Sequence, residues 1–116
     1  KALLEANRYP GPAIIIAYCN CIEHGYDLVH SKEQQRLAVD SGYWPLYRYD
    51  PSLTNRNPLQ LDTVHSKIPF TDYIKRENRF KMLAKTNPER AAQLINDAQN
   101  WINRRVQLYQ QLASNQ

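Results

Sequence analysis

Residues 13–18 form an unbroken apolar run, AIIIAY, in which three consecutive side chains are β-branched. A run of this length without polar alternation is typical of a strand that is buried on both faces, as in a parallel sheet between layers of helices. Proline and glycine at residues 10–12 end the helical pattern of residues 1–8. A helix, a turn and a buried strand make half of an α/β unit, so the sequence predicts an α/β fold with few strands.

The middle of the chain predicts one helix and two short strands. A capping box that opens at Ser31 predicts a helix from about Lys32 to Asp40. The aromatic segment 43–49 predicts a strand, and because Pro45 cannot donate to a ladder, that strand should lie at a sheet edge. After a loop, residues 59–61 alternate in polarity and predict a second short strand.

Two helices are expected at the C-terminal side. The first should run from a cap at Thr71 to Lys85, and Asn87 with Pro88 marks the start of a second helix of roughly 25 residues. Arg105 falls inside the apolar stripe of this second helix, where it should snorkel or pair. We therefore predict an α/β segment over residues 1–69 and a helical hairpin that packs on it over residues 70–116.

Cys19 and Cys21 come directly after the predicted buried strand and are separated by one residue. In open α/β sheets, ligands bind beyond the carboxyl ends of the strands, so this position favours a functional role. A disulfide across one residue would be strained, which predicts two free thiols. Spacing alone favours two small buried side chains, but one or both thiolates could also contribute to an iron–sulfur cluster whose other ligands lie elsewhere.

Histidines near the two cysteines leave other sites open. Cys19, Cys21, His24 and His30 supply the four ligands of a zinc site, although their spacing is not that of common zinc fingers. His24 could serve as a general base, but no partner for it is visible in the sequence, so a loop histidine is favoured. No residue is assigned a catalytic role.

Aromatic and basic side chains form a second group of candidate ligand contacts. The aromatic residues of segment 43–49, with Arg48, could stack on a flat cofactor or on bases, but aromatic strands more often form core or interface. Residues 104–105 could touch phosphate, but a solvated helix face is favoured. The net charge of +4 is spread along the chain, and no apolar run reaches the length that crosses a bilayer. We expect no nucleic-acid or membrane partner, and a cytoplasmic location.

The opening of the chain indicates a piece of a longer protein. The only methionine is Met82, and residues 1–6 look like the interior of a helix without a capping residue before it. A lone strand at Ile14–Ile16 would lack sheet neighbours, so we expect an isolated segment to expose apolar edges and either self-associate or stay partly disordered.

Several phrases, in the same order along the chain, resemble the pyruvate:ferredoxin (flavodoxin) oxidoreductases. The phrases are AIIIAY at 13–18, CIEHG at 21–25, LAVDSGYWPLYRY at 37–49, NPLQLD at 57–62, ENRF at 77–80 and TNP at 86–88. The resemblance covers nearly the whole chain and implies a C-terminal part of the thiamine-diphosphate-binding domain, a partial α/β fold followed by two helices.

The resemblance implies an enzyme that oxidatively decarboxylates pyruvate on thiamine diphosphate and magnesium and forms acetyl-coenzyme A. Electrons would pass through iron–sulfur clusters to ferredoxin or flavodoxin, in an enzyme that is a homodimer at full length. Cys21 matches the family's cluster ligand and would be the last of four ligands to a [4Fe–4S] cluster, whereas Cys19 falls where the family varies and receives no role. The segment alone should be inactive. The alternative is a non-catalytic module that binds a protein partner.

Overall fold

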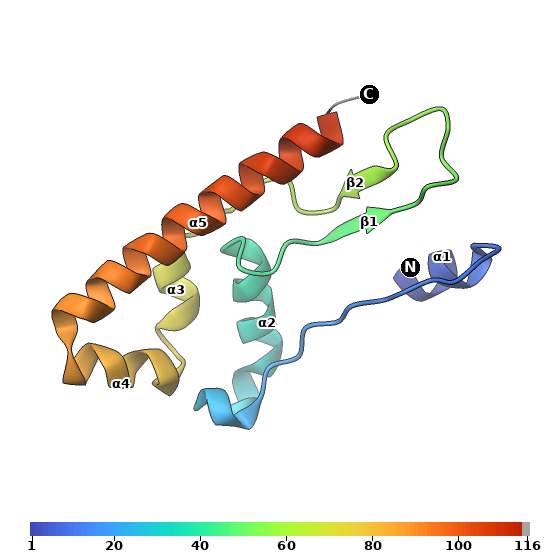
Figure 1. The fold of residues 1–116 in the computed structure, drawn as a ribbon. Coiled ribbons are helices and arrows are strands. Elements are labelled where there is room, and N and C mark those ends of the chain that lie inside the picture. Colours follow the sequence, from blue (N-terminus) through green and yellow to red (C-terminus); the bar gives the residue numbers. More distant parts are fainter. Residues whose placement is uncertain (115–116) are drawn as a thin grey trace.

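Helices dominate the computed structural model, which describes residues 1–114 (Figure 1). The molecule is elongated, measuring 52 × 30 × 21 Å. In chain order the elements are α1 (Ala2–Arg8), the short 3-10 helices η1 (Ile22–His24) and η2 (Leu28–His30), α2 (Ser31–Asp40), β1 (Tyr47–Tyr49), β2 (Leu59–Leu61), α3 (Phe70–Ile74), α4 (Asn78–Thr86) and α5 (Pro88–Ser114). This mixture of helices and a small sheet is consistent with a partial α/β segment that ends in two helices.

The longest helix begins where the sequence predicts. The Asn87 side chain caps α5, because its Oδ1 accepts a hydrogen bond of 3.0 Å from the backbone N–H of Arg90. Pro88 occupies the first helical position, where its missing N–H costs no intrahelical bond. Helix α4 packs against the start of α5, so the last two helices form a hairpin (Figure 1).

The predicted helix from Thr71 to Lys85 is wrong in its continuity. The structure has two helices there, α3 and α4, separated at residues 75–77. Glu77 adopts an extended conformation, with φ −94° and ψ 119°, and its side chain is wholly buried. The extended residue turns the buried carboxylate toward its hydrogen-bond donors, Gln34 and Arg79, which offset the cost of its burial.

The two predicted short strands both form, but the first is shorter than expected. Only Tyr47–Tyr49 of segment 43–49 is a strand, and it pairs antiparallel with Leu59–Leu61. Arg48 lies opposite Gln60 in this register. The predicted helix near 32–40 also forms, but the capping box is wrong, because the Ser31 hydroxyl donates to the Leu28 carbonyl at 2.7 Å instead of capping the helix.

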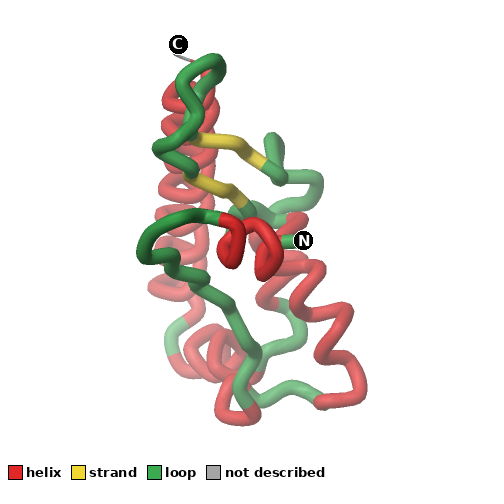
Figure 2. Tube along the Cα trace, turned by 90° about the vertical axis from the view of Figure 1, so that its right-hand side faces the viewer, coloured by secondary structure: helices red, strands yellow, loops and turns green. Residues whose placement is uncertain are grey.

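The predicted buried strand over residues 13–18 does not form. This segment belongs to the connection between α1 and η1, and Figure 2 shows it as loop. Ile14 and Ile16 are 87% and 72% exposed. A strand needs a neighbour for its backbone hydrogen bonds, and within residues 1–114 the chain offers none to this segment. The exposed apolar surface agrees with the expectation for a segment without its sheet.

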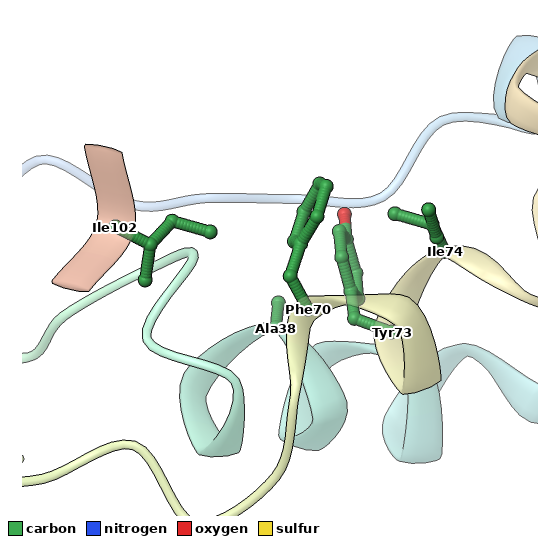
Figure 3. Close-up of a cluster of buried hydrophobic side chains, with 5 residues drawn as sticks. All are labelled: Ala38, Phe70, Tyr73, Ile74 and Ile102. Atoms are coloured by element: carbon green, nitrogen blue, oxygen red, sulfur yellow. The ribbon is translucent and has the colours of Figure 1, made fainter. Parts of the chain in front are cut away.

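The core lies where α2, α3 and α5 meet. Its buried side chains, drawn in Figure 3, are Ala38, Phe70, Tyr73, Ile74 and Ile102. An aromatic layer covers this core, in which Tyr43 stacks on Tyr73 with ring centroids 4.9 Å apart. Because α2 and α5 meet in one core, residues on both sides of the predicted division at 69–70 pack together. The division itself stays a prediction.

Arg105 is paired within the chain, as predicted for its place in the apolar stripe, so the solvated helix face favoured for residues 104–105 is wrong for Arg105. Its Nη2 donates to the backbone carbonyls of Gly42 and Tyr43, each at 2.7 Å, and its guanidinium lies 4.2 Å from the ring centroid of Trp101. These contacts fasten the turn after α2 to α5. No helix within residues 1–114 is both long and apolar enough to cross a membrane.

Candidate functional site

Cys21 lies at the start of a short, well-defined turn. Its thiol is free and exposed, and its carbonyl accepts a hydrogen bond of 3.0 Å from the backbone N–H of His24. The turn continues as η1 and closes at Gly25, which has a left-handed φ of 70°. The backbone around Cys21 is therefore ordered locally, while its sulfur is accessible from outside the segment.

Cys19 is also a free, exposed thiol, so the prediction of two free thiols is confirmed. Its Sγ donates a weak hydrogen bond to the Asn20 carbonyl at 3.4 Å. The interpretation of both cysteines as small buried side chains is wrong. Burial was inferred from the strand before them, and that strand has no neighbours within residues 1–114.

The turn after Cys21 is attached to the start of α4. The backbone N–H of Asn78 donates to the Gly25 carbonyl at 3.0 Å. A Cβ on Gly25 would lie only 2.7 Å from the Cβ of Asn78, so the close approach and the left-handed φ both require glycine here. Two segments that are distant in sequence thus meet without space for another side chain.

The segment before Cys21 has its own anchors. The Tyr18 hydroxyl lies 2.8 Å from the Tyr73 hydroxyl, and the Tyr18 ring stacks on Trp44 with centroids 5.2 Å apart. Asn20 donates from Nδ2 to the Ser31 carbonyl at 3.3 Å. Burial, the largest cause, raises the pKa of the Tyr73 hydroxyl far above its usual range, and burial also raises the pKa of Tyr18. Both hydroxyls are therefore neutral across the physiological pH range.

A buried polar cluster lies behind the turn. The Glu77 carboxylate accepts from Gln34 Nε2 at 2.9 Å through Oε1 and from Arg79 Nε at 2.6 Å through Oε2. Gln34 Nε2 also donates to the Tyr73 carbonyl at 2.9 Å, and the Gln34 and Glu77 side chains are both fully buried. His24 completes the cluster, with Nδ1 4.0 Å from Glu77 Oε1. The helical pattern does not mark this cluster, because it places Glu77 inside one continuous helix. Glu77 and Arg79 do fall in the phrase ENRF that carries the resemblance, which is the signal that could have pointed to them.

The structure does not assemble a zinc site. Within residues 1–114, no group of three or more His, Cys, Asp and Glu side chains could hold a metal ion. His24 faces Glu77, and His30 Nδ1 lies 3.7 Å from Glu33 Oε2. The thiol donors present are those of Cys19 and Cys21, both exposed, and they could supply part but not all of the ligands of a metal site. His24 is partly buried beside a carboxylate, which describes a packed histidine rather than an accessible base.

The aromatic segment 43–49 divides between core and surface. Tyr43 and Trp44 pack against the core, whereas Tyr49 is 64% exposed. Tyr47 meets Tyr109 of α5 edge-on, with ring centroids 5.4 Å apart. Arg48 donates to Asp62 through Nε and Nη2 at 2.9 and 2.7 Å. The interpretation as core is confirmed for Tyr43 and Trp44, and an interface at the exposed rings stays a prediction.

Comparison with known proteins shows which class of protein the chain resembles. No family model matches the chain. A pyruvate-flavodoxin oxidoreductase of Trichormus variabilis is 51% identical over 116 residues, which is 98% of this chain. A pyruvate-flavodoxin oxidoreductase of Rhodospirillum rubrum is 46% identical over 114 residues, and a pyruvate:ferredoxin oxidoreductase of Moorella thermoacetica is 43% identical over 115 residues.

The chain spans about a tenth of the length of these relatives, because the matched region is 10% of each of them. It is therefore a segment related to much longer oxidoreductases. More narrowly, it is homologous over nearly all of its length to one segment of the pyruvate-flavodoxin and pyruvate:ferredoxin oxidoreductases. The resemblance drawn from the sequence phrases is confirmed.

Proposed function

We propose that this chain is the part of a pyruvate:flavodoxin or pyruvate:ferredoxin oxidoreductase that contributes one cysteine ligand, Cys21, to a [4Fe–4S] cluster. The complete enzyme would oxidatively decarboxylate pyruvate to acetyl-coenzyme A and carbon dioxide, with thiamine diphosphate and magnesium bound elsewhere in it. The electrons would leave to ferredoxin or flavodoxin. We further propose a homodimeric, cytoplasmic enzyme, of which this segment alone has no activity.

One observation carries this proposal: the near-complete match to such oxidoreductases, in a chain whose Cys21 thiol is exposed at an ordered turn. A ligand supplied by this segment must be accessible to donors outside it, and Cys21 meets that requirement. The alternative of a non-catalytic partner-binding module is not favoured, because the relatives are enzymes.

A bound cluster would supply one-electron transfer. The residues of this chain would hold the ligating sulfur in place: the turn over η1 fixes the backbone of Cys21, and the contact between Gly25 and Asn78 fixes the turn. The backbone N–H groups of residues 20–22 adjoin this thiol, and we expect them to donate to cluster sulfurs, which would raise the reduction potential.

Cysteine variants of the full-length enzyme test the proposal. Cys21→Ser should lose or destabilise one cluster, seen as lower iron content and the loss of one component of the electron paramagnetic resonance spectrum after reduction. Cys19→Ser is the matched control, with the same chemical change two residues away, and should keep the full spectrum. A normal spectrum and iron content for Cys21→Ser would refute the proposed ligand.

A further inference from the structure

We infer that the buried carboxylate of Glu77 is a positioning residue for Cys21: it holds the turn from Cys21 to Gly25 at the junction of α2, α3 and α4. This inference rests on the proposed function, because the position of the turn matters for function only if Cys21 binds a cluster. Glu77 does not touch the proposed cluster ligand itself. It acts through His24 and through the start of α4.

The chain before Cys21 is anchored only close to the cysteine in the described part of the chain. Residues 13–17 are exposed and have no strand partner within residues 1–114. Tyr18 and Asn20 anchor the chain just before Cys21 through ring stacking and side-chain hydrogen bonds. On the other side, the Cys21 backbone depends on η1 and Gly25, which come after it in the chain.

The turn itself rests on two consecutive residues, Glu77 and Asn78. The Asn78 backbone N–H holds the Gly25 carbonyl, and the imidazole of His24 lies against the Glu77 carboxylate. His24 Nδ1 is buried and has no hydrogen-bond partner in the described part of the chain, and Glu77 Oε1 at 4.0 Å is a carboxylate oxygen beside it. A small inward movement of the turn would convert this contact into a charge-assisted hydrogen bond.

Glu77 also ties three helices together at this place. Gln34 comes from α2, Arg79 from α4, and Gln34 also holds the carbonyl of Tyr73 in α3. The carboxylate charge is balanced by Arg79, whose side chain is one-third exposed, so the pair is a partly solvated ion pair that reaches into the core. A buried carboxylate is costly unless it is fully paired, so the site selects one arrangement of these helices and thereby one place for the turn.

Glu77→Gln in the full-length enzyme tests this inference. The amide keeps the size of the side chain but removes the charge that Arg79 and His24 face. We expect about tenfold faster iron release from one cluster under a chelator, the usual scale for lost support of a metal ligand. A shifted midpoint potential and an altered resonance line shape for that cluster should accompany it.

Two matched controls separate positioning from general stability. Glu33→Gln makes the same chemical change in an exposed ion pair. The partner of Glu33 is Arg76, the residue directly before Glu77, and this variant should leave the cluster unchanged. Ile102→Ala removes a buried side chain from the core on α5 and should speed hydrogen exchange in α5 without altering the potential or line shape of the cluster.

Each outcome bears on one claim. If Glu77→Gln matches Glu33→Gln in iron release, potential and line shape, the positioning role is wrong. It is also wrong if Ile102→Ala gives the same spectrum as Glu77→Gln.

A second variant covers the case in which Glu77→Gln does not accumulate as folded protein. His24→Asn leaves the carboxylate and its other partners in place, and it should show a weaker effect of the same kind. A normal cluster in His24→Asn would then overturn the inference. A cluster lost in Cys21→Ser but normal in Glu77→Gln refutes this inference alone, whereas a normal Cys21→Ser refutes the proposed function.

Discussion

Gly25→Ala is the sharpest single perturbation that the structure suggests. Two effects oppose the alanine. The φ of 70° costs an L-residue roughly 1–2 kcal/mol. The added Cβ would lie 2.7 Å from the Asn78 Cβ, which is near the backbone and cannot swing away, so the turn and α4 must separate slightly. Against this, replacing glycine reduces the entropy of the unfolded chain, a gain of roughly 0.4–1 kcal/mol.

The balance is a local destabilisation of about 1–3 kcal/mol once the steric displacement is included. At about 1.4 kcal/mol for each factor of ten, opening of the turn should become roughly 5- to 150-fold more frequent. Because a long multidomain enzyme does not unfold in one step, the change should be sought locally rather than in a melting temperature. Hydrogen exchange in the full-length enzyme, followed on the peptide that contains Asn78, reports the loss of its bond to the Gly25 carbonyl.

Gly11→Ala is the control for this experiment. Gly11 does not have a positive φ, and the atoms nearest to an added Cβ belong to the movable ring of Tyr9. Exchange at Asn78 should be unchanged in this variant. If Gly25→Ala also leaves Asn78 exchange unchanged, the turn is not fastened to α4 in the way that the structure indicates, and the positioning of Cys21 through Gly25 is refuted.

Other contacts support three more predictions. Asn87→Ala removes the cap of α5 and should destabilise that helix by about 1 kcal/mol, seen as faster exchange of the Arg90 and Ala91 amides, whereas Asn87→Asp should retain protection. The pKa of Tyr73 is raised on folding, so its contribution to stability is complete below pH 10 and is lost as the pH rises above that value. Tyr73→Phe should therefore flatten the alkaline fall in stability in a pH series of thermal denaturation of the isolated segment, and an unchanged profile would contradict it. In the isolated segment, Ile14→Ser with Ile16→Ser should reduce self-association in sedimentation and binding of a hydrophobic dye, whereas equal association with the unmodified segment would show that other surfaces drive it.

Local signals predicted the elements whose determinants lie within a few residues. The start of α5 is determined by the side chains of Asn87 and Pro88 themselves. The alternation of residues 59–61 predicted a strand, and these residues form β2. The phrases around Cys21 single it out as the candidate ligand, and that assignment stays a prediction. Features that depend on distant partners could not be predicted: the break between α3 and α4 exists because Glu77 meets Gln34 of α2, 43 residues away in sequence.

The failure at residues 13–18 has a different physical origin from the failure at Glu77. The sequence of AIIIAY is that of a buried strand, yet the described chain leaves Ile14 and Ile16 exposed, since no segment within residues 1–114 pairs with it. Pattern and structure are reconciled if the sheet lies in the nine-tenths of the relatives' length that this chain does not span. Insertion of this run into such a sheet would fix the chain before Cys21, while Gly25, His24 and Glu77 fix the chain after it. The sulfur would then be held from both sides, which is the rigidity that a ligand shared between distant parts of one enzyme requires.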